Sequence, residues 1–599
     1  MNTLPMKATE AQFLAPSEPD MSNPFLGESF RAIDLMTSAS IARATFGFSP
    51  TAFWLAFADW GAHLAAAPGK RTELAVKADQ KSMRLLTHML QSILDPDTPW
   101  CIEPLPGDER FQDEAWQRWP HRFWAQAFLL TQQWWHNATH DVTGVSQHHE
   151  DVVSFAIRQW LDMASPANML WANPETIQRT METGGLNLLF GARNLAEDCH
   201  RLLMGQPPVG TEDFVVGRNV AVTPGKIVFR NHLIELIQYA PATNAVQAEP
   251  VLIVPAWIMK YYILDLSPAN SLIRFLVERG HTVFCISWRN VTAEDRDLSL
   301  DDYRRFGVMA ALDAVAAIVP DRKIHAAGYC LGGTILTLAA AAMAQDGDHR
   351  LASVTLFAAQ TDFTEPGELQ LFIDDSQIAF IEAMMWQHGT LEASQMSSAF
   401  QMLRSNDLIW SRMIHEYLMG EREPLNDLMA WNADATRMPY QMQSDYLRNL
   451  FLHNDLASGR YMVDGQPAVI QNIRVPIFAV GTEHDHVAPW RSVHKIHYLT
   501  DTDVTFVLTS GGHNAGIVSE PGHRGRHFRM LEKKPDDPCL SADEWYSVAP
   551  VCDGSWWPAW EAWLSAQTNS EPVAPPTMGA PIKGYPPLCD APGSYVMQR

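Results

Sequence analysis

The sequence is short of basic residues and lacks any long apolar run. Lys and Arg total 44 against 68 Asp and Glu, which gives a formal net charge of −24. A general electrostatic attraction to nucleic acid or to anionic lipid is therefore disfavoured, and an anionic ligand must be held by a local basic pocket. No stretch approaches the roughly 20 apolar residues of a membrane-spanning helix, and the first residues lack the basic and apolar regions of a signal peptide.

The cysteines are too few and too scattered for a disulfide framework or a zinc site. They are odd in number and form no Cys-x-x-Cys pair. Their positions are Cys101, Cys199, Cys285, Cys330, Cys539, Cys552 and Cys589. This spacing predicts free thiols in a reducing cytoplasm and no bound metal.

Apolar and aromatic residues, by contrast, are plentiful. The chain has 599 residues, 47% of them hydrophobic, with 21 Trp and 26 Met, which is enough for a large catalytic domain and a further domain. The simplest interpretation of the Trp and Met residues is that they fill a large core. The alternative is that some of them contact an apolar surface other than a bilayer.

The first third of the chain is predicted to be helical. Residues 1–40 are polar and interrupted by proline, and we expect them to form a disordered or loosely docked lead-in. Residues 41–205 are predicted to form an α-helical domain, because segments such as 123–135 and 152–163 place apolar residues three and four positions apart. An aromatic stretch in this domain favours core packing over an interaction face, and its members are Trp116, Trp119, Trp124, Trp134 and Trp135.

After residue 206, strands and helices alternate as in an α/β protein. Strands are predicted at 251–254, 281–287, 324–329, 351–358, 475–480 and 504–508, and helices at 271–279, 303–316 and 331–344. This alternation predicts a doubly wound, mostly parallel sheet in a catalytic domain of residues 206–599. A hairpin-like region at 219–229, with its turn at 223–225, precedes it. The alternation lapses at about 361–458, a Met-rich helical segment placed where a lid would sit and called the lid insertion below.

The segment Gly328-Tyr329-Cys330-Leu331-Gly332 is a nucleophile elbow with Cys in place of Ser. It stands at the predicted junction between strand 324–329 and helix 331–344. The turn that lifts the nucleophile clear of the backbone is so tight that a Cβ at either flanking position would clash, which explains the glycines. We therefore predict an α/β-hydrolase-type fold with Cys330 as its nucleophile, in preference to a buried structural cysteine in a Gly-rich turn.

An acid and a base follow Cys330 in the order that this fold requires. Asp485 comes just after strand 475–480, and His513 lies in a glycine-rich loop after strand 504–508. In this arrangement His513 takes the proton of Cys330, and Asp485 holds the imidazole in the required tautomer. The thiolate then attacks an acyl carbonyl and forms a thioester on the enzyme. Because exchange between thioesters is nearly isoenergetic, this nucleophile suits acyl transfer from a CoA thioester.

An oxyanion formed in that attack needs two hydrogen-bond donors. The first is predicted to be the backbone N–H of Leu331, which follows the nucleophile. The second is expected in the loop after strand 251–254, near Trp257 or Ile258.

Basic and imidazole groups near the acid and the base are candidate substrate contacts. His484 and His486 flank Asp485, and contact with substrate or packing of the loop are equal alternatives for them. The basic run at 523–529, which includes Arg524 and Arg526, is a candidate site for the phosphates of CoA. The competing interpretation of this run is a solvated surface.

Long motifs in this order resemble the bacterial polyhydroxyalkanoate synthases. Cys330, Asp485 and His513 match the catalytic triad of that family. Met259 and His484 depart from its usual residues at positions that bear on substrate range. The resemblance covers about residues 110–599 and is carried by FVVGRNVAVTPGKIVFRNHLIELIQYAP (214–241), KYYILDLSPANSLIRFLVERGHTVFCISWRN (260–290), GYCLGGT (328–334), DHVAPW (485–490), SGGHNAG (510–516) and GSWWPAWEAW (554–563).

The resemblance implies polymerisation of (R)-3-hydroxyacyl-CoA into a storage polyester, with release of CoA and no cofactor besides the CoA of the substrate. It implies that His513 also activates the 3-hydroxyl of the incoming unit, which attacks the thioester on Cys330. It further implies a homodimer bound to polyester granules in the cytoplasm. A long chain with its own N-terminal domain resembles the single-subunit synthases that prefer short units such as 3-hydroxybutyryl.

Two other functions stay open on the sequence. A thioesterase or polyester depolymerase would use the same triad on water and release free 3-hydroxy acid, although hydrolases of this fold usually carry Ser. A non-catalytic granule-coating protein would rely on the Trp-rich and Met-rich regions, and it would keep its function after Cys330→Ala.

Overall fold

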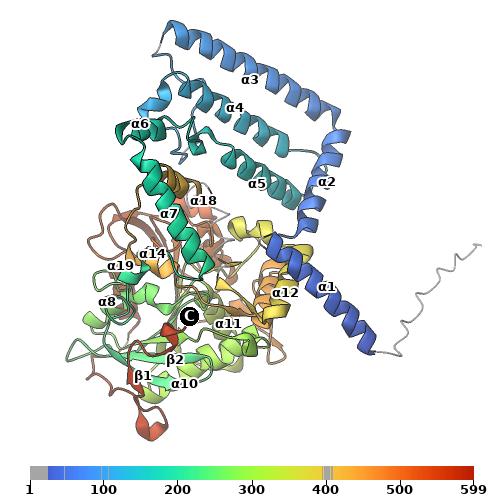
Figure 1. The fold of residues 1–599 in the computed structure, drawn as a ribbon. Helices are drawn as coiled ribbons and strands as arrows, with labels where there is room; N and C mark the ends of the chain where they lie inside the picture. Colours follow the sequence, from blue (N-terminus) through green and yellow to red (C-terminus); the bar gives the residue numbers. More distant parts are fainter. Residues whose placement is uncertain are drawn as a thin grey trace, which may run out of the picture.

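A layer of N-terminal helices stands on a catalytic α/β domain (Figure 1). The computed structural model describes residues 24–45, 47–95, 97–105, 107–393, 395–396, 405, 409–568 and 570–599. The N-terminal helices are α1 (Pro24–Ala44), α2 (Pro50–Ala66), α3 (Pro68–Leu94), α4 (His121–Thr139), α5 (Gln147–Met163), α6 (Pro174–Glu182) and α7 (Leu186–Leu203). Among the described helices, none is both long and apolar enough to span a bilayer.

The starts of these helices are set by local capping. The side chain of Ser49 caps α2, that of Ser146 caps α5, and Asn173 accepts from two amides at the start of α6. Each cap satisfies a backbone N–H that has no partner within its own helix. Proline follows the cap at the first turn of α2 and α6, where its missing N–H costs no hydrogen bond.

The prediction of a disordered lead-in over residues 1–40 is wrong for residues 24–40, which form most of α1. This helix packs along α12 (Asp375–His388) of the lid insertion (Figure 1). Helix formation here depends on a tertiary contact with a segment more than 300 residues away, and that contact leaves no mark in the local sequence pattern. Residues 1–23 lie outside the described part of the chain.

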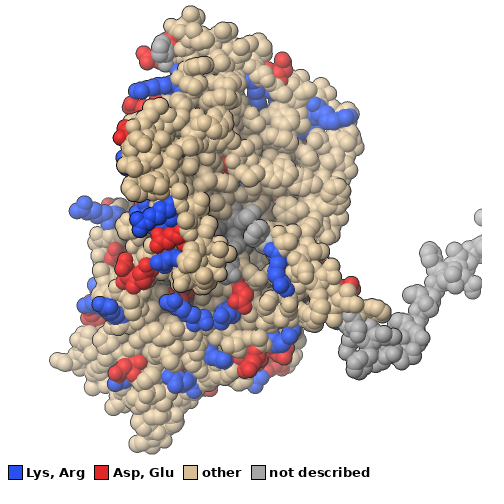
Figure 2. Space-filling view, viewed as in Figure 1, with Lys and Arg blue, Asp and Glu red and all other residues tan. Residues whose placement is uncertain are grey.

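The aromatic stretch of the N-terminal domain is divided between core and surface. Trp116 is completely buried and packs edge-on against Phe111. Trp119, by contrast, is 74% exposed. The core-packing interpretation therefore holds for Trp116 and is wrong for Trp119. On the face shown in Figure 2, the charged side chains of this upper region lie mostly toward its margins.

The described residues of the catalytic domain form an 11-stranded sheet in the order β14-β13-β12-β11-β6-β5-β3-β4-β2-β1-β15. The run from β12 to β4 is parallel, as predicted, and both edges are antiparallel. The strands are β1 (Gly225–Arg230), β2 (Ile234–Tyr239), β3 (Val251–Val254), β4 (Val283–Trp288), β5 (Ile324–Tyr329), β6 (Leu351–Phe357), β11 (Ile477–Thr482), β12 (Val504–Thr509), β13 (His527–Lys533), β14 (Val551–Asp553) and β15 (Cys589–Asp590).

The hairpin predicted at 219–229 is displaced along the chain. Its strands are β1 and β2, and its turn is at 231–233, so the turn predicted at 223–225 is wrong. The side chain of Asn231 accepts hydrogen bonds from the amides of Leu233 and Ile234. Asn231 forms an Asx turn, which is a turn signal in the sequence as well. The prediction instead placed the turn at the Pro-Gly pair of residues 224–225.

Helices cover the sheet, and further helices build the lid insertion between β6 and β11. The covering helices are α8 (Leu272–Glu278), α9 (Leu300–Asp302), α10 (Ala310–Ile318), α11 (Leu331–Asp346), α16 (Trp490–His494), α17 (Ile496–Leu499), α18 (Ala542–Val548) and α19 (Trp557–Gln567), with a π-helical segment η6 (Tyr303–Met309) joining α9 to α10. The lid insertion contains η7 (Gly367–Phe372), α12, η9 (Met413–Leu418), α14 (Asp427–Asn432), α15 (Tyr440–Asp445) and η10 (Tyr446–Leu452), and a pair of two-residue strands, β7 (Thr390–Leu391) and β8 (Met438–Pro439).

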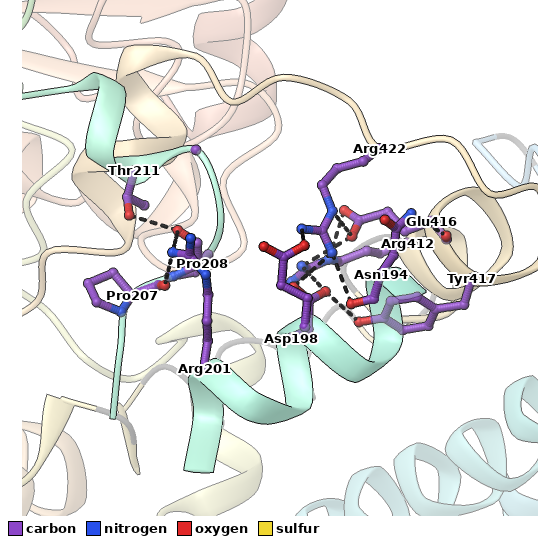
Figure 3. A network of polar contacts seen from close by, with 12 residues as sticks. Asn194, Asp198, Arg201, Pro207, Pro208, Thr211, Arg412, Glu416, Tyr417 and Arg422 are labelled. Carbon is purple, nitrogen blue, oxygen red and sulfur yellow. Dashed lines mark hydrogen bonds and ion pairs between the residues drawn. The ribbon is translucent and has the colours of Figure 1, made fainter. Parts of the chain in front are cut away.

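The last N-terminal helix, α7, is docked tightly on η9 of the lid insertion. A Cβ added to Gly191 would lie 1.9 Å from the carbonyl oxygen of Tyr417, so the two backbones touch. Figure 3 shows Asp198 of α7 among three donors of the lid insertion, because it accepts from Arg412, Tyr417 and Arg422 at 2.9–3.1 Å. The N-terminal domain is therefore fastened to the lid insertion by backbone contact and by ion pairs.

Two buried histidines are expected to make the folded protein less stable as the pH falls. His494 and His497 stack against each other at 4.4 Å beside Phe506 and Trp545, and burial lowers their pKa values to about 4 and about 3. The unfolded chain binds protons below about pH 6.5 that the folded chain excludes, so the free energy of unfolding falls as the pH falls. The aromatic substitution His494→Phe is expected to remove about 2 kcal/mol of the loss between pH 7 and pH 5.

Urea unfolding of both proteins at pH 7 and pH 5 measures this difference. If the free energy of unfolding fell by the same amount in the variant and in the original chain, His494 would not contribute to the loss of stability between pH 7 and pH 5.

Candidate active site

Cys330 occupies a strained turn between β5 and α11. Its backbone angles are φ 53° and ψ −123°, in a region that residues with a Cβ seldom adopt. Close approach of neighbouring backbone requires the glycines, since a Cβ on Gly332 would lie 2.0 Å from the carbonyl oxygen of Val254, and one on Gly328 would lie 2.4 Å from Cα of Gly333. The sequence elbow is thus a structural elbow that presents the Cys330 sulfur at the end of the parallel strands.

The structure brings Asp485 and His513 together beside Cys330. The Nδ1 of His513 lies 2.8 Å from Oδ2 of Asp485. The other carboxylate oxygen accepts from the amides of Val487 and Ala488, at 2.9 and 2.8 Å, and Thr482 donates its hydroxyl to Oδ2. The carboxylate is therefore fixed by the chain that follows it, and Nε2 of His513 is left to face the sulfur.

The electrostatics of the triad favour an ion pair between Asp485 and His513. Burial by itself raises the pKa of Asp485, but the charge of His513 and the hydrogen bonds to the carboxylate outweigh it and hold the pKa below its usual value. Burial likewise lowers the pKa of His513, and the charge of Asp485, with the charge and hydrogen bond of Cys330, raises it well above its usual value. The imidazole is thus held ready to accept and keep the proton of the thiol.

Two contacts hold the loop of His513 in place. Tyr329, which precedes the nucleophile, donates its hydroxyl at 2.6 Å to the side chain of Asn514, which follows the base. On the other side, the guanidinium of Arg526 donates to the carbonyl oxygens of Ser510 and Ala515 at 3.2 and 2.6 Å. The loop that carries His513 is thereby tied both to the end of β5 and to the residue before β13.

An apolar cavity of about 140 Å³ adjoins Cys330. The catalytic domain contributes Cys330, Leu331 and Ile258, and the lid insertion contributes aromatic walls that include Phe363 and Tyr446. A cavity of this composition suits an aliphatic acyl group.

Both predicted oxyanion donors line this cavity. Leu331 is the first residue of α11, where a backbone N–H has no acceptor within its own helix. The carbonyl of Ile258 accepts from the amide of Thr436 at 3.0 Å, and that of Trp257 accepts from the Thr436 hydroxyl at 2.5 Å. The oxyanion loop is therefore fastened to the lid insertion. Met259, where the resemblance shows a departure, forms a backbone bridge to Ala435 in the same contact.

The predicted substrate contacts lie farther out. His484 and His486 are exposed and do not line the cavity, and Arg524 is exposed as well. Arg526 is half-buried and engaged by the His513 loop, and burial lowers the pKa of its guanidinium. Arg526 therefore stabilises the His513 loop. Of the two arginines, only Arg524 has an exposed side chain that a phosphate could reach.

Several cavity residues were not anticipated from the sequence. Phe363, Tyr446 and Phe451 come from the lid insertion, and Gly47 and Phe48 come from the junction of α1 and α2. No local motif marks any of them, because each reaches the cavity through the tertiary fold alone. Within the described residues, no three His, Cys, Asp or Glu side chains are grouped as metal ligands would be.

Comparisons with known proteins match most of the chain to named families and relatives. Family models match residues 107–276 (Poly-beta-hydroxybutyrate polymerase N-terminus), 28–70 (Poly-beta-hydroxybutyrate polymerase N terminal) and 249–519 (alpha/beta hydrolase fold). The chain is 39% identical over 544 residues to a poly(3-hydroxyalkanoate) polymerase of Methylorubrum extorquens, covering 89% of this chain and 87% of that protein. It is 38% identical over 499 residues to a poly(3-hydroxyalkanoate) polymerase subunit of Cupriavidus necator, covering 82% and 83%.

Among solved structures, a monoglyceride lipase variant from Saccharomyces cerevisiae aligns with a TM-score of 0.34 and 11% identity, over 58% of this chain and 96% of that one.

Proposed function

The chain belongs to the poly(3-hydroxyalkanoate) polymerase family, and from this premise we propose that it polymerises (R)-3-hydroxyacyl units, taken from their CoA thioesters, through a thioester on Cys330. It is an acyltransferase-type enzyme of α/β-hydrolase fold. One observation carries the proposal: a Cys nucleophile with an Asp-His pair stands at the wall of a mostly apolar cavity.

In the loading step, His513 takes the proton of Cys330 and the thiolate attacks the thioester carbonyl of the substrate. We assign the backbone amides of Leu331 and Ile258, two residues that line the cavity, as the donors to the resulting oxyanion. As the intermediate collapses, the bond to the CoA sulfur breaks and CoA leaves with the proton from His513. The products are free CoA and an acyl group on Cys330.

In the elongation step, His513 takes the proton of the 3-hydroxyl of an incoming hydroxyacyl-CoA. The hydroxyl oxygen attacks the thioester on Cys330, an ester bond forms, and the bond to the Cys330 sulfur breaks. His513 returns the proton to that sulfur. The chain, one unit longer and carried by CoA, then reloads onto Cys330 and releases CoA.

The cavity supports transfer over hydrolysis. Its walls are mostly apolar, and the lid insertion supplies the larger part of them, so the cavity favours a bound hydroxyacyl group over water beside the thioester. A thioesterase or depolymerase with the same triad would need to hold a water molecule at that place instead.

The finer parts of the proposal concern the substrate and the assembly. A cavity of about 140 Å³ suits short units such as 3-hydroxybutyryl. Exposed Arg524 is the proposed contact for the CoA phosphates. By family membership we further propose a homodimer that works on the surface of polyester granules in the cytoplasm.

Incubation with (R)-3-hydroxybutyryl-CoA tests the proposal. Release of CoA thiol is expected to be matched, unit for unit, by solvent-extractable polyester. Release of CoA accompanied only by free 3-hydroxybutyrate would identify a thioesterase instead. The absence of release with both 3-hydroxybutyryl-CoA and longer 3-hydroxyacyl-CoA substrates would refute both.

A further inference from the structure

The wall of the catalytic cavity is completed by the N-terminal domain. Cys330 and the residues of the lid insertion line most of the cavity, but Gly47 and Phe48 line it as well. These two residues lie at the junction of α1 and α2, more than 280 positions before the nucleophile. The cavity therefore takes its final shape only when the N-terminal segment is in place.

A side chain of the lid insertion clamps this segment by its backbone. Gln377 of α12 accepts a hydrogen bond from the amide of Ser49 at 2.8 Å and donates one to the carbonyl of Gly47 at 2.7 Å. Gln377 is itself buried, so both bonds are shielded from water. Gly47 has a φ of 87°, which lets the chain turn from α1 toward the cavity, and the hydroxyl of Thr45 donates to the Phe48 carbonyl at 2.7 Å.

Aromatic packing holds the Phe48 ring at the wall. Its ring lies 5.2 Å from that of Phe372, which also lines the cavity. The ring of Phe372 also packs against that of Phe155 of α5, with 6.0 Å between the ring centres, and Phe155 does not line the cavity. The Phe48 ring thus packs against a second ring of the wall, which is held in turn by α5, and this packing restricts the movement of Phe48.

We propose that Phe48 is a specificity-determining residue, which restricts the length of the acyl side chain accepted beside Cys330. The inference rests on the proposed function and deepens it, because the wall contributed by the N-terminal domain then limits the hydroxyacyl unit. A rigid ring excludes extra methylene groups at the wall, and each methylene gained or lost in an apolar pocket changes the relative rate by about 10-fold or more.

The variants Phe48→Ala and Phe48→Trp test this assignment in the full chain. We expect Phe48→Ala to raise the ratio of kcat/KM for 3-hydroxyhexanoyl-CoA over 3-hydroxybutyryl-CoA by about 10-fold, and Phe48→Trp to lower it. The matched control is Phe155→Ala, which weakens the same aromatic cluster without opening the cavity. Its ratio is expected to stay within about twofold of the original value.

A second measurement does not depend on polymerisation. The rate at which N-hexylmaleimide modifies Cys330, relative to N-ethylmaleimide, is followed on the Cys330 peptide by mass spectrometry, since other thiols of the chain are exposed. This ratio should rise in Phe48→Ala and not in Phe155→Ala. If it does so while no acyl-CoA is polymerised, the proposed function fails, and what stands is that Phe48 restricts the size of the group accepted beside Cys330. Equal ratios in the original chain and both alanine variants would overturn the inference.

Discussion

Cys330→Ala is expected to abolish polymer formation and to lower the rate of CoA release by at least about 10⁴-fold. The substitution removes the atom that carries the acyl group, and no other thiol replaces it. Cys285, the buried cysteine of β4, is inert, because burial raises the pKa of its thiol well above the usual value. The initial rates of CoA release and the yield of extractable polyester, measured side by side, check this prediction.

Two further variants control for structure. Cys285→Ala removes a buried thiol of the same sheet and should keep full activity within about twofold. Cys330→Ser keeps a nucleophile at the strained elbow, with a hydroxyl oxygen in place of the sulfur. It should lose polymer formation while retaining slow release of free acid, since an oxygen ester is a poorer acyl donor to the 3-hydroxyl of the next unit than a thioester is. If Cys330→Ala kept its activity, the polymerase would act through another group, and the assignment of Cys330 as the nucleophile would fail.

Local sequence was sufficient where the chemistry is local. The bounds of β3 and β5 agree with the predicted strands residue for residue. The apolar run of β3 ends at a proline on each side, and β5 leads directly into the Gly-rich turn of the elbow. The order Cys330, Asp485, His513 and the glycines of the elbow also follow from the chain itself, and the structure places all three groups together.

Sequence was insufficient where contacts are remote. Nothing near Arg526 reveals that its guanidinium reaches back to the Ser510 and Ala515 carbonyls. The sequence therefore predicts a phosphate site in the run that contains it, and the structure adds that the last residues of the run begin β13, the strand beside the edge strand β14. The placement of Phe48 at the cavity likewise depends on Gln377, more than 300 residues later. Such pairings are set by tertiary packing and carry no periodicity.

Asp485→Asn is expected to lower kcat by about 10³–10⁴-fold with little change in KM. The substituted amide can keep the contacts of Oδ1 with the Val487 and Ala488 amides. At the other position, an NH₂ group facing His513 cannot accept the proton of Nδ1. The imidazole then turns to the tautomer that carries its proton on Nε2, where it can no longer take the proton of Cys330. Steady-state release of CoA measures both parameters.

The same substitution separates the charge of Asp485 from its shape. Because that charge raises the pKa of His513, its loss lowers the fraction of imidazolium beside the sulfur at neutral pH, and the alkylation of Cys330 by iodoacetamide at pH 7 should slow. Glu483→Gln is the matched control, since this neighbouring carboxylate pairs with His527 instead. An unchanged alkylation rate in Asp485→Asn, together with a normal kcat, would mean that His513 acts without the carboxylate. A slowed alkylation with kcat reduced in proportion would show that activation of the Cys330 thiol limits polymerisation.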